Sequence, residues 1–328
     1  MREDARAVAA CYDHPPAAHP PTPLGPIVVA HADGKGVALV QPPAATPPVR
    51  LGKGQTRTKK KEAIVTALYT IAPYVRTAQE VLAALLRDAA PQERTNRPRP
   101  VGKELRATLD GKAAAVTKLA QRAARREGPQ VRDRVALTDG AAALQEQMRM
   151  PLPGYTLVLD SMHASAYLWD RANALLGETA APRSAWVRGQ LEQILRGQTA
   201  DVIAALEIEL QGSPRTPAHV QALRTTIGYY QRNLAYMRYD VYRARGWPIG
   251  TGVVEGACGH VVKDRMEQAG MRWTPDGAQA LLDLRAVRLS GDWDAYWQFH
   301  RHQQHERLDG ATALRPRGAE TQALQQAA

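Results

Sequence analysis

Three acidic residues stand where an apolar run of the chain ends or where a helix is expected to begin. Asp33 closes the run in VVAHADGKGV, Asp139 closes the run in RVALTDG, and Glu255 follows PIGTG in GWPIGTGVVEG. Cleavage or strand transfer at a phosphodiester needs a deprotonated nucleophile and a stabilised leaving oxygen, and two Mg²⁺ (or Mn²⁺) ions held by carboxylates supply both. Two Asp and one Glu suffice, because substrate phosphate and water complete the coordination. The three residues predict a divalent-metal site for phosphodiester chemistry.

Each acid alone has a simpler explanation. An Asp before a Gly commonly forms a turn, and a Glu in the first turn of a helix offsets the helix dipole. The assignment therefore depends on a strand order that brings the three together. An alternative takes Asp139 and Asp160 as the first two ligands. We favour Asp33, because the alternative leaves the HADGKGV segment without a role.

The composition favours a polyanionic partner. The chain has 43 Lys and Arg against 32 Asp and Glu, which gives a net charge of +11 and a pI near 9.8. So basic a balance is typical of nucleic-acid binding. No apolar run approaches the roughly 20 residues of a membrane span, and the N-terminus has no apolar signal core. Cys11 and Cys258 form neither a disulfide framework nor a zinc motif, so we expect a protein of the reducing cytoplasm.

The elements that must position these acids follow from the hydrophobic pattern. We predict strands at 27–33 and 37–40, joined as a hairpin, and further strands at 63–72, 133–139 and 155–160. Helices are predicted from Thr77, over 103–127 and from 140 to 150, and throughout the chain after residue 164. Three early strands followed by alternating helices and strands resemble the ribonuclease H-like fold, a mixed five-stranded sheet flanked by helices.

Longer stretches resemble the DDE transposases of bacterial insertion sequences of the ISKra type, which are relatives of Mutator-like transposases. The resemblance covers about residues 27–308. The segment 236–273, RYDVYRARGWPIGTGVVEGACGHVVKDRMEQAGMRW and the residues before it, is its most specific part. The other matching stretches are HADGKGV, GKGQTRTKKKEAIVTALYTIAPYVRTAQEV, ALTDG, LVLDSMHASAYLWDRANAL and GDWDAYWQFH.

This resemblance implies a metal-dependent enzyme that cuts DNA at transposon ends and transfers the 3′-OH into target DNA. It implies Asp33, Asp139 and Glu255 as the metal-binding triad, and a homo-oligomer on DNA in the bacterial nucleoid. It also divides the chain. We expect an irregular segment at 1–26, a catalytic core at 27–177 and 249–308, an all-α insertion at 178–248 before the glutamate, and a flexible tail at 309–328.

Family members carry a substantial region before the first aspartate, whereas 32 residues precede Asp33 here. We therefore expect an N-terminally shortened copy with little selectivity for transposon ends. Two alternatives stay open: a ribonuclease H-like nuclease without strand transfer, and a catalytically inactive, truncated DNA-binding remnant.

Asp160 and His163 in LVLDSMH form an auxiliary pair at the next strand end. Mutator-like relatives are similar in having Cys-x-x-His here, with Asp160 standing where that Cys would be. The pair would neighbour a metal or contact the scissile phosphate, and the simpler alternative is a cap on the following helix.

Basic residues in two segments are the candidates for phosphate contact. One is the run from Arg50 to Lys61, which contains no acid, and the other follows Glu255 on the same predicted helix. The predicted DNA-binding residues are Arg50, Lys53, Arg57, Lys59, Lys60, Lys61, Lys263 and Arg265.

Overall fold

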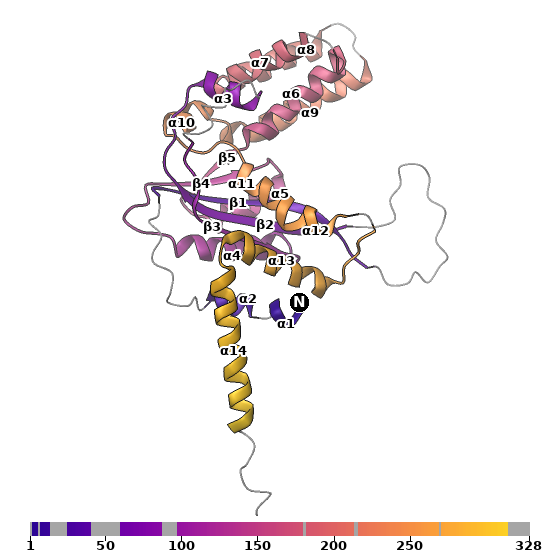
Figure 1. Ribbon diagram of the computed structural model, residues 1–328. Helices are drawn as coiled ribbons and strands as arrows, with labels where there is room; N and C mark the ends of the chain where they lie inside the picture. Colours follow the sequence, from indigo (N-terminus) through magenta and orange to yellow (C-terminus); the bar gives the residue numbers. More distant parts are fainter. Residues whose placement is uncertain are drawn as a thin grey trace, which may run out of the picture.

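The computed structural model of the chain describes residues 2–5, 7–13, 25–40, 60–86, 97–179, 182–212, 216–268 and 270–313. Five strands form one mixed sheet in the order β3-β2-β1-β4-β5. Their bounds are β1 Ile27–Ala38, β2 Lys60–Ile71, β3 Val101–Thr108, β4 Asp133–Thr138 and β5 Thr156–Leu159. β2 is antiparallel to β1 and β3, whereas β4 is parallel to β1 and β5 is parallel to β4. The sheet therefore has the predicted ribonuclease H-like arrangement (Figure 1).

The first two predicted strands are one strand. β1 continues through the GKG sequence and pairs with β2 along its whole length, so the prediction of a hairpin at 27–33 and 37–40 is wrong. Gly34 and Gly36 lie beneath long side chains of β2, and a Cβ atom at Gly34 would clash with the carboxylate of Glu62. These glycines are needed for close cross-strand approach, and not for a turn.

The third strand of the structure, β3, lies where the sequence pattern predicts the start of a helix, so this part of the prediction is wrong. β3 occupies the start of the region predicted as a helix at 103–127, and the helix itself, α4, spans Lys112–Ala124. The sequence VGKELRAT alternates, so that Leu105 and Ala107 pack into one face of the sheet while Glu104 and Arg106 lie on the other. Helix α13 (Pro275–Ser290) covers the open edge of β3, because Ser290 Oγ accepts from Leu105 N at 2.9 Å.

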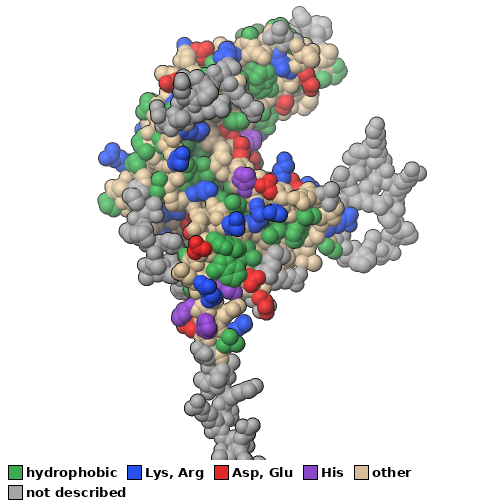
Figure 2. Space-filling model, viewed as in Figure 1, with side chains coloured by type: hydrophobic (Ala, Val, Ile, Leu, Met, Phe, Trp, Pro, Cys, Tyr) green, Lys and Arg blue, Asp and Glu red, His purple; other side chains and the backbone are tan. Residues whose placement is uncertain are grey.

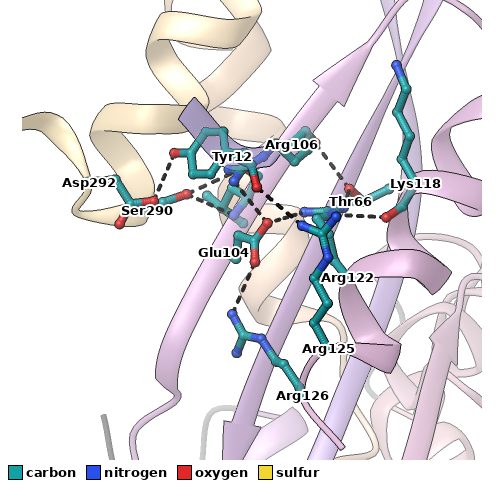
Figure 3. Close-up of polar contacts among 11 residues, drawn as sticks. Tyr12, Thr66, Glu104, Arg106, Lys118, Arg122, Arg125, Arg126, Ser290 and Asp292 are labelled. Atoms are coloured by element: carbon teal, nitrogen blue, oxygen red, sulfur yellow. Dashed lines mark hydrogen bonds and ion pairs between the residues drawn. The ribbon is translucent and has the colours of Figure 1, made fainter. Parts of the chain in front are cut away.

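A cluster of arginines ties the N-terminal segment to the other side of β3 (Figure 3). Glu104 forms ion pairs with three guanidinium groups, those of Arg106, Arg122 and Arg126. The Arg106 guanidinium lies 3.1 Å from the ring centroid of Tyr12, whose hydroxyl donates to Asp292 at 2.8 Å. Tyr12 belongs to α2 (Val8–Asp13), which follows α1 (Arg2–Ala5). The segment predicted as irregular thus contains two short helices, held by these contacts; residues 14–24 lie outside the described part.

Helices cover both faces of the sheet. α4 and α5 (Ala142–Arg149) pack on the face formed by Val28 and Leu68. On the opposite face one group of helices packs over Val29 and Leu137, and a second group, including α13, packs over Val37 and Ala107. Asp33 lies on this face of β1, between Val29 and Val37. It is therefore placed at the junction of the two groups.

The first of these groups forms a helical arm above the sheet (Figure 1). It contains α6 (Ser161–Leu176), α7 (Pro182–Leu195), α8 (Thr199–Gln211) and α9 (Pro217–Asn233), joined by α3 (Ala78–Leu85) and α10 (Tyr239–Ala244). Helices α7 to α10 fall within the predicted insertion at 178–248. Thr77 caps α3 through a capping box with Glu80, as its sequence predicts.

The described part of the chain ends in a projecting helix, α14 (Trp293–Ala313) (Figure 1). It extends into the predicted flexible tail at 309–328, of which residues 314–328 lie outside the described part. Among the described residues, no helix combines the length and apolar character that a membrane span requires.

Candidate active site

The register of the parallel strands places three aspartates in one row. His31 pairs with Leu137 between β1 and β4, and Thr138 pairs with Leu159 between β4 and β5. Continuing each register brings Asp33 opposite Asp139, and Asp139 opposite Asp160. Because side chains alternate along a strand, these residues share the face that carries the helical arm.

Asp33 is half-buried and accepts two hydrogen bonds. Gly34 N donates to its Oδ1 at 2.6 Å, and Cys258 Sγ donates to its Oδ2 at 3.2 Å. Burial raises the pKa of Asp33 and the negative charge of Asp139 raises it further, while the hydrogen bonds act in the opposite direction. The charge of Asp139 acts on Asp33 because the two carboxylates are neighbours. A cation between them would relieve this repulsion.

Asp139 is held by the turn that follows it and by the arm. Its Oδ1 accepts from Ala141 N at 2.8 Å, and its backbone carbonyl accepts from the Tyr229 hydroxyl of α9 at 2.8 Å. Gly140 has φ +88°, and a Cβ atom there would lie within 2.8 Å of three atoms of the Tyr229 side chain. The Asp-Gly pair is therefore required both for the backbone conformation and for contact with the arm.

Asp160 is fully buried and receives three hydrogen bonds. Met162 N donates to Oδ1 at 3.0 Å, while His163 Nδ1 (2.7 Å) and the Thr251 hydroxyl contact Oδ2. Burial favours a higher pKa for Asp160, but these hydrogen bonds outweigh it and the pKa is lowered. The hydrogen bond to Asp160 in turn raises the pKa of His163 above its usual value, helped by the charges of Asp139 and Glu255.

Glu255 approaches the row of Asp33, Asp139 and Asp160 from a helix and not from the sheet. It lies on α11 (Gly252–Ala257), which leads into a π-helical segment, Cys258–Lys263. Its Oε1 contacts the Thr251 hydroxyl and lies 3.9 Å from His163 Nδ1. One helical turn later, Cys258 contacts Asp33. The helix thus runs across the row of aspartates, with Glu255 beside Asp160 and Cys258 beside Asp33.

These donors suit a metal ion. One ligand atom from each of Asp160, His163 and Glu255 lies within 4.8 Å of the other two. Carboxylate oxygens suit Mg²⁺ and Mn²⁺, and an imidazole nitrogen suits Mn²⁺ better than Mg²⁺. Figure 2 shows acidic and histidine side chains at the inner end of a notch between the helical arm and the rest of the molecule.

A second histidine, His31, lies two residues before Asp33 on the same face. It is 1% exposed, and neither ring nitrogen has a hydrogen-bond partner among the described residues. Burial lowers its pKa to about 3, against the opposing charge of Asp160. His31 is therefore neutral at physiological pH and adds no positive charge beneath the acids.

Four of the predicted DNA-binding residues are described, and all four are exposed. Lys60 and Lys61 lie at the start of β2, and Lys263 and Arg265 follow α11. Lys60 Nζ is already paired with Glu267 at 3.0 Å. The others, Arg50, Lys53, Arg57 and Lys59, lie outside the described residues.

Beside α11 the structure has a basic pocket that the sequence does not indicate. It has a volume of about 430 Å³ and lies between β3, α11 and α13, with Arg99, Lys103 and His260 among its lining residues. Gly256 and Ala257 of α11 also line it, whereas the site residues Glu255 and Cys258 do not.

The contacts of Thr251 and Cys258 are not among the sequence-based predictions. Cys258 is buried, at 5% exposure, yet its thiol reaches a carboxylate of the site. Thr251 lies four residues before Glu255, and Cys258 lies three residues after it. Helical spacing alone therefore places both on the face of the helix that carries Glu255. That spacing is the signal in the sequence from which both could be found.

No family model and no curated protein matches the sequence. Among solved structures, the chain is similar to the Drosophila P element transposase strand transfer complex, with 8% identity and a TM-score of 0.34 over 82% of this chain and 78% of that one.

Proposed function

We propose that this protein is a DDE-type DNA transposase, in which Asp33, Asp139 and Glu255 bind two divalent ions. The observation that carries the proposal is the register of the ribonuclease H-like sheet, which makes Asp33 and Asp139 neighbours beneath the helix of Glu255. Asp33 and Asp139 lie on the same face of the sheet, and the notch leaves that face accessible (Figure 2).

In this proposal each residue has a separate role. Asp33 and Asp139 hold the ions from the sheet, and Glu255 completes the second site from α11. Bound ions would activate water or a 3′-OH and stabilise the leaving oxygen. His163, with Nδ1 fixed by Asp160, presents its other ring nitrogen for a contact to the scissile phosphate, and its raised pKa favours the protonated form.

DNA is the proposed partner. The charge of +11 supports it, and so does the pocket beside α11, where Arg99 and Lys103 provide cations for backbone phosphates. The motif resemblance favours the ISKra type of insertion-sequence transposase among enzymes on this fold. Strand transfer would then join a 3′-OH end to target DNA, and this step distinguishes a transposase from a nuclease.

The test is an assay that separates the three candidate functions. Purified protein is incubated with Mn²⁺ or Mg²⁺, a supercoiled plasmid and a labelled duplex with free 3′-OH ends. Covalent transfer of label to the plasmid would support the transposase. Nicking without transfer would assign the protein to the nucleases, and the formation of neither product would favour the inactive DNA-binding remnant. EDTA is the control, because every metal-dependent product must disappear with it.

A further inference from the structure

The hydroxyl of Thr251 lies between two carboxylates. It is within hydrogen-bond distance of both Asp160 Oδ2 and Glu255 Oε1, and Thr251 is 1% exposed. A hydroxyl carries one hydrogen, so it donates to one of these oxygens at a time. Burying a hydroxyl is costly unless it is hydrogen-bonded, and here a carboxylate oxygen on either side can accept its hydrogen.

The Asp160 carboxylate already accepts most of the hydrogen bonds that its roughly four lone pairs allow. It is 0% exposed, one oxygen accepts from Met162 N, and the other faces His163 and Thr251. A metal ion at Asp160 would therefore compete with these donors. Glu255, in contrast, has a side chain that is 40% exposed, and therefore part of its carboxylate is accessible.

From this geometry we infer that Thr251 and Asp160 are positioning residues for Glu255. The Thr251 hydroxyl donates to Glu255 Oε1 or to Asp160 Oδ2, and the His163 ring, which Asp160 holds, lies 3.9 Å from the same Glu255 oxygen. The Glu255 carboxylate is thereby kept on the side of α11 that faces the row of aspartates. This inference rests on the proposed function, since it assigns Glu255 as the ligand and Asp160 as its support.

The backbone at Thr251 supports the same role. Its carbonyl accepts from Val254 N at 2.8 Å and from Glu255 N at 3.1 Å, so Thr251 begins the helix that carries Glu255. Within the described part of the chain, its side chain makes no capping bond to this helix. The hydroxyl is therefore available for the two carboxylates, although Thr at an N-cap commonly bonds the backbone.

The test compares Thr251→Val, which removes the hydroxyl and keeps the shape, with Thr251→Ser, which keeps the hydroxyl. Thr199→Val is the matched control, because Thr199 is a buried threonine of α8 whose hydroxyl has no hydrogen-bond partner among the described residues. Mn²⁺ affinity is measured by calorimetry, and metal-dependent plasmid nicking and thermal unfolding are followed in parallel.

We expect Thr251→Val to weaken Mn²⁺ binding about tenfold or more, the usual cost of removing a group that orients a metal ligand. Thr251→Ser should restore most of the affinity, and Thr199→Val should bind as wild type. Equal Mn²⁺ affinity in Thr251→Val and wild type would overturn the inference while leaving the proposed function intact. Failure of Thr251→Ser to restore binding would also overturn it.

The same measurements separate this inference from the proposed function. If wild type binds Mn²⁺ but does not cut DNA, the proposed function fails and the affinities still decide the roles of Thr251 and Asp160. Absence of Mn²⁺ binding by wild type would overturn both.

Discussion

At the scale of single residues, the carboxylates of the site differ in how many hydrogen bonds they already accept. Asp160 is fully buried and accepts three hydrogen bonds, whereas among the described residues half-buried Asp33 accepts two, from its neighbour Gly34 and from a thiol. A thiol is a weak donor. Asp33 is therefore the easier of the two to turn toward a metal ion, which supports choosing it over the alternative pair of Asp139 and Asp160.

His163 gives the fold a pH dependence that can be measured without metal. Its folded-state pKa is raised by Asp160, so its contribution to stability is fully present below its unfolded pKa. That contribution disappears as pH rises through the raised folded-state value. In EDTA, His163→Gln should therefore reduce the free energy of unfolding more at about pH 5.5 than at about pH 8.5.

Urea unfolding of both proteins at the two pH values measures this difference. His302→Gln is the control, because His302 is an exposed histidine of α14 that pairs with Glu306 on the same helix. If His163→Gln reduced stability equally at both pH values, the assigned Asp160–His163 interaction would be contradicted.

At the scale of elements, the contact between the arm and the β4 turn fixes Asp139. We expect Gly140→Ala to cost more stability than Gly154→Ala, although both glycines have positive φ, +88° and +80°. The shared cost of that conformation is about 1–2 kcal/mol. Gly140→Ala adds a clash with Tyr229, whereas at Gly154 the nearest atom to a new Cβ is 4.0 Å away. Chemical denaturation of the two variants checks this, and equal destabilisation would argue against a tight arm contact.

The elements also show where sequence patterns are reliable. The apolar runs before Asp139 and Asp160 predict strands correctly, because the first ends at the Asp-Gly turn and the second at the N-cap of α6. The glycines of GKG predict a turn where β1 continues, because their role is to make room for Glu62, a residue distant in sequence. The edge strand β3 is missed for a similar reason. Its free edge is satisfied by Ser290 and Gln279 of α13, which no local pattern indicates.

The candidate site also has features that the sequence predicts and features that only the packed structure shows. Asp33, Asp139 and Glu255 are candidates from their local contexts, and the predicted strand order places the three together, whereas the register that aligns the two aspartates comes from the structure. The place of the Thr251 hydroxyl between two acids is not predictable, because it depends on the orientation of α11 over the end of β5. Side-chain partners across elements require the packed structure.

At the scale of the whole molecule, the basic pocket beside α11 predicts a route for DNA. Replacing Arg99 and Lys103 with alanine should weaken DNA binding for all sequences. The slope of log affinity against log salt should become shallower by about 0.9 for each phosphate that is no longer neutralised. Lys118→Ala is the control for each single replacement, because it also removes one positive charge, from α4 on the opposite face of the sheet. A slope that changes equally in both would mean that charge alone, and not this pocket, governs binding.

The central claim is that Asp139 holds a metal ion for catalysis, and the most direct measurement is the rate of Mn²⁺-dependent plasmid nicking by Asp139→Asn. Asparagine keeps the size of the side chain and removes its charge. Because a bound ion contributes several kcal/mol to the transition state, we predict a rate at least about a hundredfold lower. DNA affinity should be unchanged, since Lys and Arg contacts to phosphates dominate it. Nicking by Asp139→Asn at the wild-type rate would contradict the claim.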